Sequence, residues 1–258
     1  MNAVVTGASS GIGFEIARIL KEKGYKVYGL SRRGTVPEGC IGMALDVTDE
    51  NSVKEVMEKI ADEDGQIDVL INNAGMGISG PVEYTATADV EKIMNVNFMG
   101  QYNCAKAVLP YMRAKKSGKI VFVSSVAGPI AIPYQTFYST SKAAVNALAL
   151  GLRNEVKDFG IKVCAVMPGD AKTGFTDARE KNMDGAEVYT HYVDSVKSME
   201  KDEINGMAPS VVANVVVKAA EKKNPKPLYT AGFTYKLLYI LFKFLPARLA
   251  YFIVGKLY

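Results

Sequence analysis

Several residue types are scarce in this sequence. Its 258 residues include no tryptophan, one histidine and three cysteines. Cys40, Cys104 and Cys164 are too few and too far apart for a disulfide framework or a metal site, so we expect a reducing cytoplasm and no metal. His191 has no Cys, Asp and His set at ligand spacing around it. We interpret it as a surface residue that at most contacts substrate.

We also expect no leader segment, and the sequence has no large excess of one charge. The apolar run at 3–5 begins almost at the initiator and leads into a glycine cluster, which is expected to leave no room for a signal peptide. We therefore expect the mature chain to start near Met1. The net charge of +4 comes from 31 basic and 27 acidic residues, which argues against nucleic-acid binding and favours small-molecule partners.

What the sequence does contain is an alternation of short β-branched runs and longer helical patterns. Parallel strands need crossover connections, so this alternation predicts an α/β fold. We expect one domain, 1–258, with a Rossmann-like doubly wound parallel sheet of about seven strands and helices on both faces. The expected strands are 3–5, 26–30, 42–45, 67–71, 119–123, 162–166 and one near 228. The expected helices are 13–23, 50–62, 90–113, 138–158 and 209–222.

A glycine-rich turn, Thr6-Gly7-Ala8-Ser9-Ser10-Gly11-Ile12-Gly13, links the first expected strand to the first helix. Glycines let the backbone turn tightly and approach a ligand. The helix N-terminus offers free N–H groups and the positive end of its dipole. A dinucleotide pyrophosphate needs this arrangement, so the turn predicts a cofactor site.

The G-x-x-x-G-x-G spacing resembles that of the short-chain dehydrogenase/reductase family, and further motifs follow in the family's order. These are Asn72-Asn73-Ala74-Gly75, Asn97, Ser125, Tyr138-x-x-x-Lys142, and Pro168-Gly169 with Thr173. Together they cover about residues 3–175. The resemblance implies an enzyme that interconverts a ketone or aldehyde and an alcohol with a nicotinamide cofactor. It also implies a homodimer or homotetramer formed through helices 90–113 and 138–158.

The end of the second strand indicates which cofactor is preferred. Members of the family that prefer NAD carry an acidic residue there, which binds the adenosine ribose. Here Ser31, Arg32 and Arg33 follow the strand, and Ser31 with Arg32 could bind a 2′-phosphate through charge-assisted hydrogen bonds. We therefore expect NADP(H) to be preferred over NAD(H), although both arginines could simply form a solvated turn. By resemblance, the cofactor site comprises Gly7, Ser9, Ser10, Gly11, Ile12, Gly13, Ser31, Arg32, Arg33, Asp46, Val47, Asn73, Ala74, Gly75, Tyr138, Lys142, Pro168, Gly169 and Thr173.

Tyr138 and Lys142 are four residues apart in a helical pattern and share one face. A phenol ionises near pH ~10, so we expect the ammonium of Lys142 to lower the pKa of Tyr138 for proton transfer. By resemblance, Ser125 holds the substrate oxygen and Asn97 positions a water through its backbone. Ser124, next to Ser125, is the competing candidate.

The substrate region is less closely specified. Residues 126–134 carry almost no charge and are expected to form an apolar wall. The segment 171–206 has an irregular pattern and is expected to be a lid that contributes Phe175, Met183, Tyr189, Tyr192 and Met199. We expect a steroid- or lipid-like substrate. The alternatives are that these residues pack the lid on the body, that the substrate is a small polar carbonyl, and that the protein is a non-catalytic NADP(H)-binding regulator.

Two features depart from a minimal member of the family. Ala171 stands where the motif after Gly169 usually has a β-branched residue, which makes the seating of the nicotinamide less defined. The apolar segment at about 234–258 carries Lys243, Pro246 and Arg248 near its centre, which predicts two short helices rather than a spanning one. This segment could lie on an anionic membrane, pack on a second subunit or wall the substrate pocket.

Overall fold

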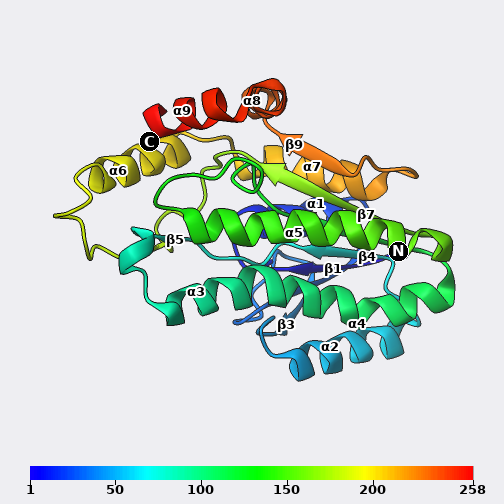
Figure 1. Ribbon diagram of the computed structural model, residues 1–258. Coiled ribbons are helices and arrows are strands. Elements are labelled where there is room, and N and C mark those ends of the chain that lie inside the picture. Colours follow the sequence, from blue (N-terminus) through cyan, green and yellow to red (C-terminus); the bar gives the residue numbers. More distant parts are fainter. Residues whose placement is uncertain (258) are drawn as a thin grey trace.

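The computed structural model describes residues 1–257 and centres on a parallel sheet between layers of helices (Figure 1). The seven strands are β1 (Asn2–Thr6), β2 (Lys26–Ser31), β3 (Ile41–Ala44), β4 (Val69–Asn72), β6 (Gly118–Val123), β7 (Ile161–Pro168) and β9 (Leu228–Ala231). They lie in the order β3-β2-β1-β4-β6-β7-β9, and every pairing is parallel. The predicted doubly wound fold is confirmed.

Helices cover both faces of this sheet. One face carries α1 (Gly11–Glu22) and α7 (Pro209–Glu221), and the other carries α2 (Glu50–Asp64), α4 (Gly100–Lys115) and α5 (Thr136–Glu155). Each face has its own buried apolar cluster, because strands covered on both sides must be apolar in both directions. Short 3₁₀ turns at Val82–Tyr84 and Lys157–Phe159 complete the connections.

The helix predicted at 90–113 is longer and less regular than expected. It starts as α3 (Thr87–Met94), passes through a π-turn at Asn95–Met99 and continues as α4. A π-turn inserts a residue into the helical repeat and changes the direction of the side chains around it, and such turns are common at functional sites. Here the turn carries Asn97, one of the predicted site residues.

The strand order reverses between β1 and β4. In open parallel sheets the ligand crevice lies beyond the carboxyl ends of the strands at this reversal. Gly7 follows β1 and Asn73 follows β4, so the two predicted cofactor motifs meet at the crevice.

The segment predicted to be an irregular lid contains more structure than expected. A two-residue strand, β8 (Glu180–Lys181), pairs with β5 (Ile78–Ser79), and α6 (Tyr192–Ile204) follows it. Tyr192, Val196 and Met199 of this helix form a third buried cluster. The many Lys and Glu residues of this helix made its helical spacing of apolar residues hard to recognise in the sequence.

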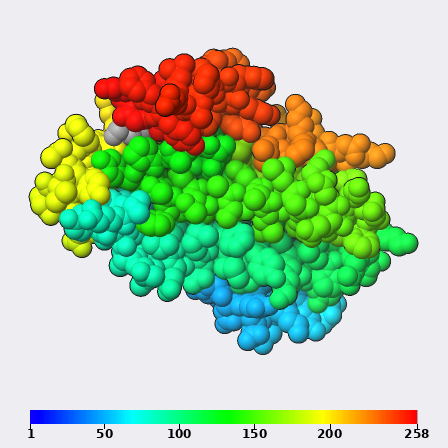
Figure 2. Space-filling model, viewed as in Figure 1, coloured from blue at the N-terminus to red at the C-terminus, as the bar shows by residue number. Residues whose placement is uncertain are grey.

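The chain ends in two helices, α8 (Phe233–Phe244) and α9 (Ala247–Leu257), with Pro246 between them. Residue 258, the end of the expected extension, lies outside the described residues. Figures 1 and 2 show the two helices as a layer along one edge of the molecule. Among residues 1–257, no helix is both long and apolar enough to cross a bilayer.

Candidate active site

The glycine turn after β1 leaves the start of α1 open. Gly7 and Gly11 have φ angles of 68° and 55°, in the left-handed region that favours glycine. A methyl group on Gly13 would overlap the carbonyl oxygen of Gly7, so the turn and the helix are in direct contact. Ser10 precedes the helix in an extended conformation, and its side chain caps none of the N–H groups of the first turn. These N–H groups are free to bind an anion, which fits a dinucleotide pyrophosphate.

Thr6 connects this turn to the segment that follows β4. Its hydroxyl accepts hydrogen bonds from the backbone N–H groups of Asn73 and Ala74, at 2.9 and 3.0 Å. The side-chain amide of Asn73 donates back to the carbonyl oxygen of Thr6 at 3.0 Å. Asn73 therefore braces the glycine turn. Sequence reasoning missed Thr6, although a hydroxyl at the last position of a central strand was visible.

The residues predicted to select the cofactor lie at the end of β2. The hydroxyl oxygen of Ser31 is buried and has no hydrogen-bond partner among the described residues. Arg32 and Arg33 are exposed, and the charge of Arg32 helps lower the pKa of Asp46, after the stronger effect of the Thr48 backbone. An orphaned hydroxyl beside two exposed guanidinium groups fits a phosphate ligand. Val47, predicted to flank the adenine, packs against Gly100.

The hydroxyl of Ser125 lies close enough to the phenol of Tyr138 to lower its pKa. Ser125 follows β6, and its hydroxyl also accepts a hydrogen bond from the N–H of Ala127 at 3.1 Å. The hydroxyl of Ser124 donates to the carbonyl oxygen of Lys142 at 2.9 Å and is buried. Ser125 thus lies beside the phenol, whereas the Ser124 hydroxyl is bonded to helix α5, so Ser125 remains the predicted catalytic serine.

Lys142 and Asn97 lie on either side of Gly75. A Cβ atom on Gly75 would be 3.2 Å from Asn97 Oδ1 and 3.4 Å from Lys142 Nζ. Lys142 is almost fully buried and donates to the carbonyl oxygen of Val123 at 3.1 Å. The amide of Asn97 bonds to both backbone groups of Met76, at 2.7 and 2.9 Å, and to the hydroxyl of Ser141 at 3.0 Å. The four predicted catalytic residues therefore surround one point beyond the sheet.

The expected lowering of the Tyr138 pKa by Lys142 is wrong for the protein without cofactor. Burial raises the pKa of Tyr138 to about 12, and the Ser125 hydroxyl offsets part of this rise. Burial also lowers the pKa of Lys142 to about 8. The ammonium lies 5.7 Å from the centre of the Tyr138 ring and points to a backbone carbonyl. Desolvation therefore outweighs their mutual attraction.

The profile of the family described as "short chain dehydrogenase" matches residues 1–184. The chain belongs to this family. It is accordingly an oxidoreductase that acts on alcohol or carbonyl groups of small molecules with a nicotinamide cofactor.

Two curated members of the short-chain dehydrogenase family are similar over most of their length. A 3-ketodihydrosphingosine reductase from Bacteroides thetaiotaomicron is 46% identical, over 86% of this chain and 84% of that protein. A probable short-chain type dehydrogenase/reductase, VdlC, from Helicobacter pylori is 35% identical, over 95% of this chain and 93% of that protein.

Solved structures share the fold. A short-chain dehydrogenase from Streptomyces avermitilis has a TM-score of 0.81 at 30% identity, and the match covers 91% of this chain and 89% of that protein. ElxO with NADP bound has a TM-score of 0.76 at 31% identity, over 92% of this chain and 98% of its own.

The part of this short-chain dehydrogenase that follows β7 closes over the crevice. The side chain of Thr173 packs against Gly11 of the glycine turn, where a Cβ would lie 3.3 Å away. The ring of Phe175 lies 5.7 Å from that of Tyr138 and covers it. The Tyr235 ring, from α8, packs on Gly169, and its hydroxyl donates to Asp170 at 2.5 Å. The C-terminal helices thus reach the motif that follows β7.

The other aromatic and Met residues expected in the lid have different surroundings. Tyr192 and Met199 are buried in the third cluster, and Tyr189 packs against that cluster. Met183 is about half exposed, and His191 is exposed at the start of α6. The apolar side chains of this segment therefore mostly pack against one another. Of the five residues predicted in the lid, Phe175 is the one whose ring contacts that of Tyr138.

Proposed function

We propose that the protein is an NADPH-dependent reductase of a long-chain, lipid-like ketone of the 3-ketodihydrosphingosine kind. The observation that carries the proposal is the placement of Ser125 and the buried Lys142 beside Tyr138, in a chain 46% identical to a reductase with that name. The uncharged loop 126–134 supplies apolar surface for the alkyl chain. The lid, 171–206, would cover it.

When bound, the dinucleotide would supply hydride to the carbonyl carbon. Tyr138 would donate its phenolic proton to the carbonyl oxygen, and Ser125 would hold that oxygen by a hydrogen bond. Ser125 would then stabilise the phenolate, since it lowers the pKa of Tyr138. Lys142 would hold the cofactor ribose, next to the network of Asn97, Met76 and Ser141. Proton loss from an alcohol to Tyr138 is the reverse direction.

NADP(H) is the cofactor we assign. The support is the orphaned Ser31 hydroxyl and the exposed Arg32 and Arg33, with no carboxylate at the end of β2. A 2′-phosphate would accept hydrogen bonds from all three residues. The glycine turn 7–13, together with Asn73 to Gly75 and with Pro168, Gly169 and Thr173, would hold the rest of the dinucleotide.

The test is NADPH oxidation with a panel of long-chain ketones, steroid ketones, small aldehydes and sugars, with NADH as the comparison. The proposal expects the long-chain ketones to be the best substrates and NADPH the better cofactor. Preference for small polar carbonyls would contradict the proposed substrate. Tight NADPH binding without turnover of any ketone would favour a regulatory NADP(H)-binding protein instead.

We also propose that α8 and α9 rest on the surface of an anionic membrane, from the cytoplasmic side. Residues 232–258 include Lys236, Lys243, Arg248 and Lys256 and no acidic residue. Phe233 and Phe244 are 84% and 81% exposed, which is unusual for aromatic side chains at a free surface. Apolar side chains interspersed with cations are typical of helices that lie in a lipid interface.

Sedimentation with lipid vesicles tests this membrane contact. The protein is expected to bind vesicles that contain anionic lipid and to bind purely zwitterionic vesicles weakly. Changing Phe233 and Phe244 to Ser should abolish binding, and the matched changes Met183→Ser and Val188→Ser, at exposed lid positions, should not. Equal binding by the Phe variant would contradict the proposal.

We propose a homodimer or homotetramer that forms through α4 and α5. Light scattering on the purified protein tests it, and a monomer at micromolar concentration would contradict it. If the Phe233 and Phe244 changes dissolved the oligomer, α8 and α9 would form the subunit contact instead.

A further inference from the structure

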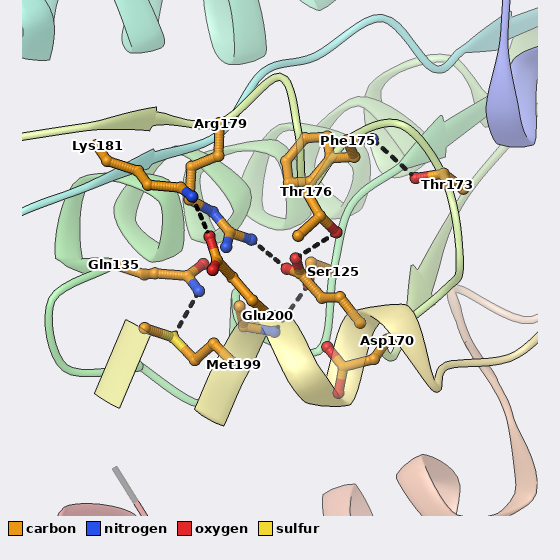
Figure 3. Close-up of polar contacts among 12 residues, drawn as sticks. Ser125, Gln135, Asp170, Thr173, Phe175, Thr176, Arg179, Lys181, Met199 and Glu200 are labelled. Atoms are coloured by element: carbon orange, nitrogen blue, oxygen red, sulfur yellow. Dashed lines mark hydrogen bonds and ion pairs between the residues drawn. The ribbon is translucent and has the colours of Figure 1, made fainter. Parts of the chain in front are cut away.

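Three charged side chains lie near Tyr138 and have no role in the chemistry above. They are Asp170, just after β7, Arg179 in the lid, and Glu203 in α6. All three act on the phenol, since Glu203 and Asp170 raise the pKa of Tyr138 and Arg179 lowers it. Figure 3 shows Asp170 and Arg179 in one group of polar side chains with Ser125. The apolar wall therefore has a polar counterpart beside the reacting groups.

Arg179 is buried and only partly satisfied. Its side chain is 0% exposed, and one terminal nitrogen pairs with Glu203. The Nε and the other terminal nitrogen have no hydrogen-bond partner among the described residues. The guanidinium lies 5.8 Å from the centre of the Phe175 ring, which in turn contacts Tyr138. Buried N–H donors are rarely left unmatched in proteins, so a ligand oxygen is the expected partner.

Asp170 carries a negative charge, opposite to that of Arg179, and pairs with no cationic side chain among the described residues. Glu203 is matched, because it accepts hydrogen bonds from Arg179 and, at 2.7 Å, from Thr176. Asp170 forms no ion pair with a described residue, and the hydrogen bond that it accepts from Tyr235 comes from a neutral group. Two carboxylates and one guanidinium leave one net negative charge where Tyr235 of α8 and Glu203 of α6 meet Asp170 and Arg179. A partly buried excess of negative charge favours a ligand with one positive charge.

We propose that Asp170 binds a protonated amine on the carbon next to the substrate carbonyl, and that Arg179 donates to a hydroxyl oxygen one carbon further on. This inference rests on the proposed function. It assigns the polar head of a long-chain 2-amino-1-hydroxy-3-ketone to Asp170 and Arg179, and the alkyl chain to the apolar loop. Tyr235 positions the carboxylate, so helix α8 contributes to head-group recognition.

The experiment compares three ketones of equal chain length: the 2-amino-1-hydroxy-3-ketone, the analogue without the amine and the analogue without the hydroxyl. Each is assayed with NADPH and the full-length protein. The variant Asp170→Asn keeps the shape and removes the charge, and Asp194→Asn, an exposed change in the first turn of α6, is its control. For Asp170→Asn, we expect kcat/KM to fall about 30-fold or more on the amine-bearing ketones and less than about threefold on the amine-free ketone.

The pH dependence separates binding from a structural role. Burial raises the pKa of Asp170, and Glu203 and Asp202 raise it further, against the lowering effects of the Tyr235 hydrogen bond and Arg179. In the unmodified protein, kcat/KM for the amino ketone should therefore fall toward acid as Asp170 gains a proton. The amine-free ketone should lack this acid limb, and so should the Asp170→Asn variant.

The outcomes distinguish the two claims. If the unmodified protein reduces none of the three ketones, the proposed function is wrong, and the inference fails with it. If it reduces all three and Asp170→Asn lowers the three rates equally or not at all, the function stands and the head-group assignment is overturned. For Arg179, the unmodified protein should prefer the hydroxylated amino ketone over its analogue without the hydroxyl, and Arg179→Gln should abolish that preference. Equal rates on these two ketones would remove Arg179 from the assignment.

Discussion

The sheet with its flanking helices and the C-terminal pair α8–α9 use apolar side chains in opposite ways. In the first region Ile16, Leu20 and Phe122 are fully buried, as expected where helices cover both faces of a parallel sheet. In the second, eleven of the twenty-one exposed large hydrophobic side chains of the described residues lie within 233–257. Apolar residues therefore stabilise the fold in one region and remain available to a partner in the other.

The largest expected effect in this comparison is on catalysis in the first region. Tyr138→Phe keeps the aromatic ring and removes the phenolic proton, so kcat should fall by at least about 100-fold. NADPH binding should persist. Steady-state kinetics check this, with Tyr134→Phe in the adjacent loop as the matched control. Near-normal turnover by a folded Tyr138→Phe protein would show that another group transfers the proton.

The second prediction contrasts burial directly. Leu20→Ala in α1 should lower the free energy of unfolding by roughly 2–5 kcal/mol, because it leaves a cavity in a fully buried cluster. Leu241→Ala in α8 removes a side chain that is 50% exposed and should cost less than about 1 kcal/mol. Urea unfolding measures both. Equal losses would mean that α8 is covered in the protein as it exists in solution.

The third prediction concerns the buried Lys142. Its pKa is about 8, below the ordinary value of 10.5, so between these pH values the unfolded chain binds more protons than the folded one. Stability should therefore rise with pH in this window, by up to about 3 kcal/mol, relative to Lys142→Met. Burial raises the pKa of Tyr138 to about 12, so this residue acts in the opposite direction only above pH ~10. Unfolding measured from pH 8 to 10 isolates the lysine, and parallel curves for the two proteins would contradict its low pKa.

The smallest expected effect lies at the cofactor end of the first region. Arg32→Ser should weaken NADPH binding by about 10-fold and leave NADH binding unchanged, because an exposed phosphate contact is partly screened. Fluorescence titration with both cofactors measures it, with Arg113→Ser at the end of α4 as a control. If Arg32→Ser weakened the binding of NADPH and NADH equally, Arg32 would not recognise the 2′-phosphate.

The sequence was most informative where one residue type has one possible role. The glycines of the turn at 7–13 and the alternation of strands and helices follow from spacing and backbone geometry, whereas the choice of Ser125 over Ser124 came from the resemblance to the family. The π-turn around Asn97 has no such signature, because one extra residue in a helix leaves the composition unchanged.

The lid was the least predictable part. Its Tyr192 and Met199 look like pocket residues in the sequence, yet they form the inner side of α6. Helical periodicity is hard to distinguish from an apolar lining when charged residues interrupt it. The roles of Arg179, Glu203 and Asp170 depend on contacts between segments far apart in the chain, which no local pattern reveals.

The most direct test of the account follows the hydride and the proton together. The protein is incubated with a long-chain 2-amino-1-hydroxy-3-ketone and NADPH that carries deuterium at the transferable position, and the product is analysed by mass spectrometry. The account predicts one deuterium on the new carbinol carbon with the unmodified protein, and almost none over the same time with Tyr138→Phe. Absence of deuterated alcohol with the unmodified protein, or equal labelling by the variant, would contradict it.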